Sequence, residues 1–415
     1  MSSEEPSRKR KHQEATAASA AAVTIEADPL AANYGEIPFN DLQSKEISGK
    51  KWTEVKDLTA GLKVKDQEVL NRESIIDAEG IVSVPAQPIT GTTQQAGEPL
   101  VCVNQDARLK YRDLDLRTRA NQDIFRIKRQ VQNIFRQFLL SEGFVEIHTL
   151  KLNKGTPACL AQAPQLHEQM FIYGGFARVF EIGPVFREEE SSTHSDLCEF
   201  TGLDVEMEIK EHYSEVMDVV DRLFVAMFDS LNETCSKELE VINRQYPFQK
   251  LKYLGKTLRL TFEEGVRMLK EAGVEIDPLG DLNTESERKL GQLVLERYDT
   301  EFFILHRYPS GVRPFYTMPC DDNPNYSNSF DGFIRGEKII SGAQRVHVRE
   351  LLTERAQACG IDVETISTYI DSFRYGAPPH GGFVVRLERV VMLFWALKNI
   401  TKTSVFPRDP RRIAP

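Results

Sequence analysis

Two neighbouring segments in which apolar residues alternate with polar or small ones constrain the fold of this chain more than any other feature. They span residues 177–187 and 199–209, and a polar loop of about eleven residues joins them. Because successive side chains of a strand point to opposite faces of a sheet, each segment is expected to form a strand with one buried face. The two strands should pair as an antiparallel hairpin.

Helical and strand-like patterns surround this hairpin. Residues 121–142 carry apolar side chains at helical spacing, which predicts a helix with one buried stripe that ends at Gly143. A strand over 144–148 should follow it. From Leu114 onward the pattern describes a large α/β or α+β domain. Its other helices are expected over 214–232, 261–272, 285–298 and 387–398, and its other strands over 301–306, 330–340 and 382–385.

The composition is that of a soluble globular protein. Of 415 residues, 41% are hydrophobic and 27% charged, so a sizeable core and two or three domains are expected. The formal charge of −10 implies that any nucleic acid would be bound through local basic surface. Scattered cysteines without metal-ligand spacing, and the lack of a long apolar stretch, favour a cytosolic protein without a zinc site, disulfides or a membrane span.

Changes in composition along the chain predict three parts. Residues 1–30 should form a disordered tail, whose basic run Arg8–Lys11 would be a nuclear signal, an RNA-contacting arm or simply solvated. Residues 31–113 contain short strand-like runs between turn residues, which indicates a small, incomplete β-rich module. The large domain occupies residues 114–415.

Three clusters of residues could carry chemistry. In the hairpin, the guanidinium of Arg187 and the ring of Phe200 could bind a phosphate and a base, although a charged turn would look the same. Arg389 opens the last predicted helix, where it could reach a polyphosphate or cap a surface turn. Arg345 follows an apolar strand and a small-residue turn, where it could bind an anion or form a structural salt bridge.

The order of these motifs resembles the cytosolic aspartate–tRNA ligases of eukaryotes, which are class II aminoacyl-tRNA synthetases. The resemblance extends from about Trp52 onward and is carried by the phrases PQLHEQM, LCEFTGLDVEME, ISGAQRVH and SVFPRDPRR. It implies an α+β fold, with a mostly antiparallel sheet flanked by helices. It also implies that the N-terminal module is a truncated OB-like, anticodon-binding domain, because a complete OB-fold has five strands.

The resemblance implies a two-step reaction. Members of this family join L-aspartate to ATP as aspartyl adenylate and then transfer the aspartyl group to tRNA(Asp), with Mg²⁺ taking part. ATP and Mg²⁺ are thus the expected cofactors, and the expected state is a cytoplasmic homodimer without membrane contact that could join a larger synthetase assembly. Because such chemistry needs little covalent help, catalysis should rest on positioning and on neutralising phosphate charge.

For the nucleotide, the resemblance assigns roles to five residues. Arg187 would bind the α-phosphate of ATP and Arg389 the γ-phosphate, which makes both candidate catalytic residues. Glu189 would hold the adenine amino group or the adjacent backbone, and Phe200 would stack on the adenine. Glu388 would orient the start of the last helix.

For the amino acid and the metal, the resemblance assigns five more. Arg345 would pair with the side-chain carboxylate of aspartate, and Gln165 and Asp204 would complete the pocket. Ser341 would contribute to both the substrate and the metal network. Glu337 is the second candidate metal ligand.

Two charge reversals distinguish the chain from the family pattern. Glu168 stands where the family has a lysine that neutralises the substrate, and a like charge there should weaken aspartate binding. Lys338 stands where the family has a carboxylate ligand of Mg²⁺, so the metal site should be impaired unless Glu337 substitutes.

Other departures concern the nucleotide and the dimer. Ser195 and Asp196 replace an Arg–His pair, and Val384 and Arg386 replace glycines that face the nucleotide, so both changes should weaken ATP binding. Leu150 replaces a proline at the family's dimer seam. A segment about twenty residues longer, with the lid over the substrate, is expected in the family between residues 151 and 161 and is absent here.

These features leave three hypotheses. The chain is a working aspartate–tRNA ligase, or it is a catalytically impaired paralogue with a binding or regulatory role. In a third, narrower interpretation, Glu168 favours a cationic or neutral amino acid or the chain makes an amide, although Arg345 would then be misplaced.

Overall fold

The computed structural model describes residues 104–153, 159–188, 196–410 and 412, together with two short strands near the N-terminus. The chain divides into two compact units, residues 1–101 and 102–415. In the first unit, β1 (Lys63–Val64) and β2 (Gly80–Ile81) pair antiparallel. The predicted tail and the rest of the predicted β-rich module up to residue 103 lie outside the described residues. Its last residues, 104–113, are described, and they contain the helix α1 (Gln105–Lys110) and the start of α2 (Arg112–Asp115) instead of strands.

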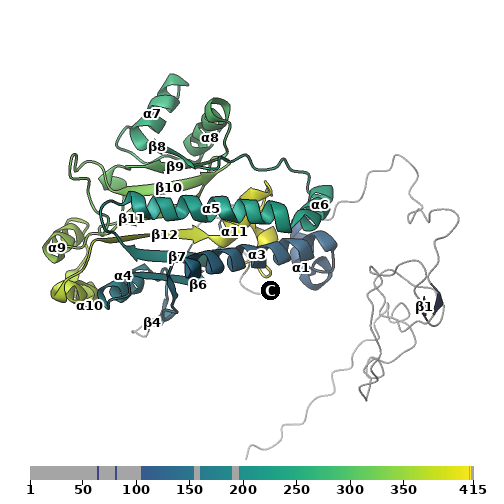
Figure 1. Ribbon diagram of the computed structural model, residues 1–415, viewed down its shortest axis with the longest axis horizontal. Helices are drawn as coiled ribbons and strands as arrows, with labels where there is room; N and C mark the ends of the chain where they lie inside the picture. Colours follow the sequence, from purple (N-terminus) through teal and green to yellow (C-terminus); the bar gives the residue numbers. More distant parts are fainter. Residues whose placement is uncertain are drawn as a thin grey trace, which may run out of the picture. The chain divides into compact units, whose positions relative to one another are not determined.

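The second unit is built on one sheet of eight strands, in the order β3-β6-β7-β12-β11-β10-β9-β8 (Figure 1). Every neighbouring pair is antiparallel except β3–β6 and β8–β9, which lie at the two edges. This arrangement confirms the predicted α+β class. The strands are β3 (Val145–Glu146), β6 (Arg178–Phe186), β7 (Glu199–Glu208), β8 (Leu258–Thr261), β9 (Phe302–His306), β10 (Ser329–Ile334), β11 (Glu337–Gln344) and β12 (His380–Arg386).

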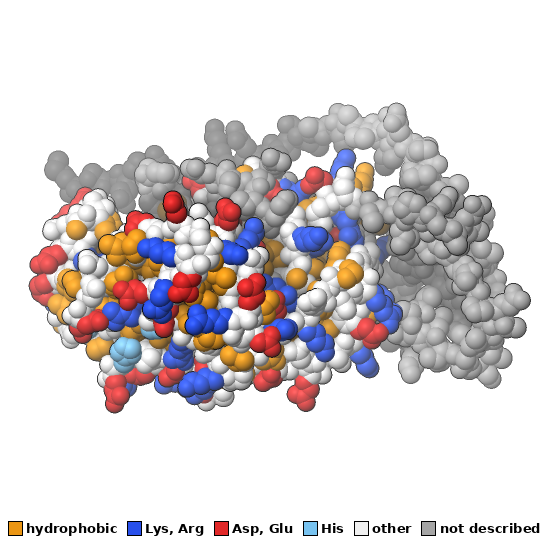
Figure 2. All heavy atoms as spheres, turned by 90° about the horizontal axis from the view of Figure 1, so that it is seen from above, with side chains coloured by type: hydrophobic (Ala, Val, Ile, Leu, Met, Phe, Trp, Pro, Cys, Tyr) orange, Lys and Arg blue, Asp and Glu red, His pale blue; other side chains and the backbone are white. Residues whose placement is uncertain are grey.

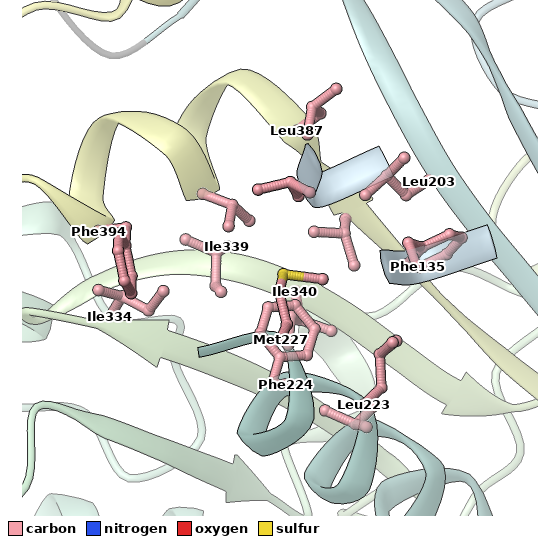
Figure 3. Packing of buried hydrophobic residues seen from close by; sticks show 14 of the residues in the cluster. Phe135, Leu203, Leu223, Phe224, Met227, Ile334, Ile339, Ile340, Leu387 and Phe394 are labelled. Atoms are coloured by element: carbon pink, nitrogen blue, oxygen red, sulfur yellow. The ribbon is translucent and has the colours of Figure 1, made fainter. Parts of the chain in front are cut away.

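Helices cover the central strands on one face of this sheet. Three of them, α3 (Arg119–Ser141), α5 (Ser214–Thr234) and α11 (Leu387–Phe394), lie side by side over the central strands (Figure 1). Their buried side chains meet the inward-facing residues of the sheet in one apolar cluster, in which Phe224 and Met227 of α5 approach Ile340 of β11 (Figure 3). The second unit also contains α1 (Gln105–Lys110), α2 (Arg112–Asp115) and α6 (Ser236–Gln245).

The opposite face of the sheet is covered only towards its ends. Helices α7 (Phe262–Glu271) and α8 (Thr284–Tyr298) pack on Phe303, Leu305 and Phe333 in a second apolar cluster. At the other end, α4 (Gln165–Tyr173) contacts β6 and β7. Helix α4 also packs on α9 (Arg349–Ala358) and α10 (Ser367–Asp371) in a third cluster, so the face between these two groups of helices is left to polar residues.

Most predicted elements are present. The antiparallel hairpin is confirmed as β6 and β7. The predicted helix over 121–142 is α3, whose buried stripe includes Ile124, Ile127, Val131 and Phe135, and which ends before Gly143 at φ 81°. None of the helices in the described part of the chain is both long and apolar enough to cross a membrane.

Three predicted boundaries are wrong. The segment 330–340 is two strands, β10 and β11, joined by a tight turn in which Arg335 and Gly336 have φ 54° and 74°. The helix predicted over 387–398 ends at Phe394, before Ala396 at φ 50°. The strand predicted over 144–148 contains only Val145 and Glu146. In the first two cases, a local turn conformation that the apolar pattern does not encode ends the element.

The small strands β4 (Leu152–Asn153) and β5 (Cys159–Leu160) form a separate antiparallel pair.

Acidic and basic side chains are interspersed on the face of the molecule shown in Figure 2. Several buried charged side chains, Glu181, Asp204, Glu206 and Asp331 among them, lie on strands of the large sheet.

Candidate active site

One row of paired residues crosses the polar face of the sheet. The strand register joins Glu181 of β6 to Asp204 of β7, then to Val384 of β12, Ser341 of β11 and Asp331 of β10. Because directly paired residues share a face of the sheet, all five side chains point to the same side. The predicted site residues Asp204 and Ser341 are therefore brought onto one surface.

Arg345 lies beside this row and is almost fully buried. Its guanidinium grips the carboxylate of Glu206, with Nη2 3.0 Å from Oε2 and Nε 3.2 Å from Oε1. The guanidinium also lies 5.6 Å from the ring centre of Tyr316, whose hydroxyl donates a 2.7 Å hydrogen bond to Gln165. The contacts through Tyr316 thus bring the predicted residues Gln165 and Arg345 together.

Two buried carboxyl groups in this region lack a hydrogen-bond partner at one oxygen each. These atoms are Oε1 of Glu168, on α4, and Oδ1 of Asp204. Burial, followed by the nearby carboxylate of Glu181, raises the pKa of Asp204 to about 7. Burial, followed by Asp204, raises the pKa of Glu168 well above its ordinary value. A carboxyl group with a raised pKa retains its proton more readily, and in its protonated form it can donate a hydrogen bond.

Glu181 remains paired beside these two acids. Its Oε1 lies 2.6 Å from Nζ of Lys151, and its Oε2 accepts a 2.7 Å hydrogen bond from the hydroxyl of Thr149. The pocket therefore combines paired carboxylates with unpaired, proton-binding ones. Unpaired polar atoms of this kind are suited to meeting the polar groups of a small ligand.

The predicted nucleotide residues lie along the adjoining part of the hairpin. The guanidinium of Arg187 is 5.6 Å from the ring centre of Phe200. A cavity of about 440 Å³ opens beside them and is lined by Phe186, Arg187, Glu188, Cys198, Glu199, Arg408, Leu160 and Gln162. Glu189 lies outside the described residues.

Glu388 is buried under this region at the start of α11. Its carboxylate accepts hydrogen bonds from the backbone N–H and the hydroxyl of Thr201, at 3.0 and 3.1 Å, and lies 2.7 Å from Nζ of Lys128. These contacts tie α11 to β7 and α3. The carboxylate therefore acts on the position of the helix rather than on a ligand directly.

Arg389 follows on the same helix and shares an anion with Arg386. Nη2 of Arg389 is 3.0 Å from Oδ1 of Asp196, and Nη1 of Arg386 is 2.8 Å from the same oxygen. Nη1 of Arg389 also donates to the backbone oxygen of Lys338. Since Arg386 lies 5.1 Å from the ring centre of Phe200, a continuous set of contacts links Arg187 to Arg389.

The residues present do not fit a resident Mg²⁺ ion at the predicted position. Both oxygens of Asp331 are bound by Arg313, at 2.9 and 3.0 Å, and Nζ of Lys338 lies 3.4 Å from Oδ2. Although burial opposes it, these two cations hold the pKa of Asp331 below its ordinary value. Ser341 accepts a 3.3 Å hydrogen bond from Arg313. Cations thus occupy the space around the oxygen ligands that Mg²⁺ would need.

Glu337 does not replace the missing ligand. Its Oε1 accepts hydrogen bonds from Arg288 of α8, at 2.9 and 3.3 Å. The register pairs Gly332 with Ile340 but Phe333 with Lys338, so a bulge at Ile339 turns Lys338 onto the face of Asp331. In the described part of the chain, no group of three or more His, Cys, Asp or Glu side chains could hold a metal ion.

Sequence reasoning missed several residues of this site, among them Glu206, Asp331 and Arg313. Glu206 lies two residues after Asp204 on the same strand, so the period-two alternation could have identified it. Asp331 is placed by its pairing with Ser341, which only the register reveals. Arg313 follows the short 3₁₀ helix Ser310–Val312 and contacts Asp331 from a loop. No local sequence pattern predicts that contact.

A mostly antiparallel sheet that presents arginines and carboxylates on one polar face is the catalytic architecture of class II aminoacyl-tRNA synthetases. Residues 104–410 match the family described as tRNA synthetases class II (D, K and N). A structure of aspartyl-tRNA synthetase from Entamoeba histolytica is similar with a TM-score of 0.74 and 49% identity, over 78% of this chain and 66% of that one.

Comparison with curated relatives identifies the family within class II more specifically. An Arabidopsis thaliana protein named aspartate–tRNA ligase 2, cytoplasmic, is 52% identical over 500 residues, which cover 94% of this chain and 90% of the relative. The Homo sapiens protein named aspartate–tRNA ligase, cytoplasmic, is 44% identical over 429 residues, which cover 92% and 86%. The chain belongs to the aspartate–tRNA ligase family. Because the plant alignment is longer than the 415 residues of this chain, some segments of that relative have no counterpart here.

Replacing Asp204 by asparagine should change how stability depends on pH. The raised pKa means that the folded state retains a proton that the unfolded chain releases, so stability should fall as pH rises from about 4 towards 7. Asp204→Asn should make this decline shallower and stabilise the protein at pH 8 by up to about 4 kcal/mol, the equivalent of about three pH units. Urea unfolding at several pH values measures the free energy of unfolding and its dependence on pH. Asp371→Asn, at an exposed site, is the control, and an unchanged slope in Asp204→Asn would contradict the assignment.

Replacing Lys338 by glutamate should create a divalent-cation site. The change removes the ammonium beside Asp331 and adds oxygen ligands close to Glu287, whose Oε1 lies 3.8 Å from the present ammonium. Titration with Mn²⁺, followed by calorimetry, should show binding at least about tenfold tighter than in the parent chain. Lys338→Met removes the charge without adding a ligand and is the matched control. Equal Mn²⁺ binding by Lys338→Glu and Lys338→Met would show that the carboxylate does not reach the site.

Proposed function

We propose that this chain is an aspartate–tRNA ligase, which uses ATP to activate L-aspartate and charges tRNA(Asp) in the cytoplasm. The observation that carries the proposal is that one sheet face presents Arg345 and the carboxylate row beside the set of contacts that links Arg187 to Arg389. The names of the plant and human relatives supply the amino acid, the tRNA and the compartment. A catalytically impaired paralogue is not favoured, because these extensive similarities are to ligases.

In the proposed first step, a carboxylate oxygen of aspartate attacks the α-phosphorus of ATP, and pyrophosphate leaves. Arg187 would neutralise charge at the α-phosphate, and Arg389 would hold the γ-phosphate. Adenine would stack on Phe200, while Glu189 would bind its amino group. Glu388 would keep α11 in register with the hairpin, so that these groups retain their separation.

In the second step, a terminal ribose hydroxyl of tRNA(Asp) attacks the acyl carbon, and AMP leaves. The hydroxyl proton passes to the phosphate of the departing AMP or to water as the new ester forms. Here the protein's task is again to hold the reacting atoms together, because the mixed anhydride is already activated.

The amino-acid end of the site is proposed to bind aspartate through a neutral acid. Arg345 would exchange part of its contact with Glu206 for the substrate's side-chain carboxylate, and protonated Glu168 would donate a hydrogen bond in place of the family's lysine. Gln165, Asp204 and Ser341 would complete the pocket. Since a neutral donor attracts an anion less than an ammonium does, aspartate affinity should be lower than with lysine there.

Mg²⁺ is proposed to reach the site as a companion of the ATP phosphates rather than as a resident ion. Arg313 and Lys338 already neutralise Asp331. Mg²⁺ prefers phosphate oxygens and water over a site that contains an ammonium.

A homodimer is proposed from the apolar surface near β3. Leu140, at the end of α3, and Val145, on β3, are about half exposed. Leu150, Leu152 and Leu160 are also exposed in the segment that follows. Apolar residues gathered at the edge of a sheet are typical of a surface that another chain covers. Association with a larger synthetase assembly stays a prediction of the resemblance.

Aspartate-dependent exchange of pyrophosphate into ATP tests the proposed function. The purified chain should catalyse exchange, Arg187→Ala should lower the rate by about 100-fold or more, and Arg222→Ala, at an exposed site on α5, should not change it. Glu168→Lys should lower the KM for aspartate. Asparagine in place of aspartate tests the alternative amino acid.

Two outcomes would contradict this function. Exchange with asparagine but not with aspartate would show that the chain activates a different amino acid. No exchange with either amino acid, while tRNA(Asp) is still bound, would favour the impaired paralogue with a binding role.

A further inference from the structure

Two departures from the family pattern meet in the folded chain. Asp196 precedes β7, whereas Arg386 ends β12, 190 positions later. Each was expected to weaken ATP binding independently. Instead, Nη1 of Arg386 lies 2.8 Å from Oδ1 of Asp196, so the added cation and the added anion form one ion pair.

The same carboxylate oxygen also binds Arg389, at 3.0 Å. Two guanidinium groups therefore converge on a single anionic oxygen, which is the arrangement that binds a phosphate oxygen. The side chains are 15–24% exposed, so solvent screens these contacts only in part. Burial, followed by the proximity of Arg386, lowers the pKa of Arg389, which is the expected effect of two neighbouring cations.

Arg386 also covers the surface expected to receive the base. Its guanidinium lies 5.1 Å from the ring centre of Phe200, and Val384, two residues earlier on β12, pairs with Asp204. Arg386 therefore projects from the polar face of the sheet between the predicted adenine and phosphate positions. The guanidinium is placed to contact a nucleotide rather than to stabilise a distant surface.

We propose that Asp196 is an internal competitor of the terminal phosphates of ATP, and that Arg386 is a second phosphate-binding guanidinium, carried by β12 in place of the cations missing from the hairpin loop. This inference rests on the proposed function, because it assumes that ATP binds at Arg389. Binding of ATP exchanges the carboxylate for phosphate oxygens at Arg386 and Arg389. AMP lacks the β- and γ-phosphates, and so it does not have to displace Asp196.

The competition predicts a change in the affinity for ATP but almost none in the affinity for AMP. Asp196→Asn keeps the size of the side chain and one acceptor oxygen but removes its charge. Asp196→Asn should bind ATP roughly tenfold more tightly than the parent chain, because an anion no longer competes for two guanidinium groups. The affinity for AMP should change by less than about twofold, and Asp196→Ala should behave in the same way.

A third variant tests the role of Arg386. Adding Arg386→Ala to Asp196→Asn should abolish the gain in ATP affinity, because the second phosphate-binding group is lost. Asp371→Asn, which breaks an exposed ion pair with Arg349 at 3.1 Å, is the matched control and should leave both affinities unchanged. Calorimetric titration of the full-length chain with ATP and with AMP gives all of these values, and thermal unfolding shows whether each variant is folded.

The outcomes separate the inference from the proposed function. If folded Asp196→Asn binds ATP no more tightly than the parent chain, or loses affinity for ATP and AMP together, Asp196 is a structural residue and the inference is overturned. If neither the parent chain nor any folded variant binds ATP, the proposed function itself is contradicted. Tighter ATP binding that persists without Arg386 supports the competition but contradicts the role of Arg386.

Discussion

The placement of charge on one buried sheet face is the constraint on which the rest of the site depends. Glu181, Asp204 and Glu206 lie on two neighbouring strands and are almost fully buried, with Glu168 from α4 above them. Burying charge is costly unless each group is paired or neutralised. Arg345 and Lys151 pair with Glu206 and Glu181, whereas Asp204 and Glu168 respond by binding protons more tightly. The result is a pocket that is organised before a ligand arrives.

The alternation of residues predicted much of the fold but not the contacts within the site. The hairpin β6–β7 and helix α3 follow directly from local periodicity. The bulge at Ile339 does not, although it decides that Lys338 rather than Glu337 lies beside Asp331. Likewise, Asp196 and Arg386 belong to distant segments, so the sequence shows two separate changes where the structure has one ion pair. Register and long-range pairing are properties of the sheet, and a single strand does not reveal them.

The departures from the family pattern that change charge within the site are compensated by neighbouring groups. The cation at Lys338 meets the carboxylate of Asp331, and the cation at Arg386 meets the carboxylate of Asp196. Burial and the neighbouring Asp204 raise the pKa of Glu168, which favours its uncharged form. A site that had simply decayed would be expected to leave unbalanced charges in a region this buried. The compensation is consistent with a reorganised ligase site in which protein groups supply charges that the family obtains differently.

A crystal structure of the chain with ATP and aspartate tests this account most directly. The account predicts a single nucleotide whose α-phosphate contacts Arg187, whose terminal phosphate contacts Arg389, and whose adenine lies on Phe200, with aspartate beside Arg345. A nucleotide bound elsewhere, or phosphates that contact only one of the two arginines while the other faces a different cavity, would contradict it.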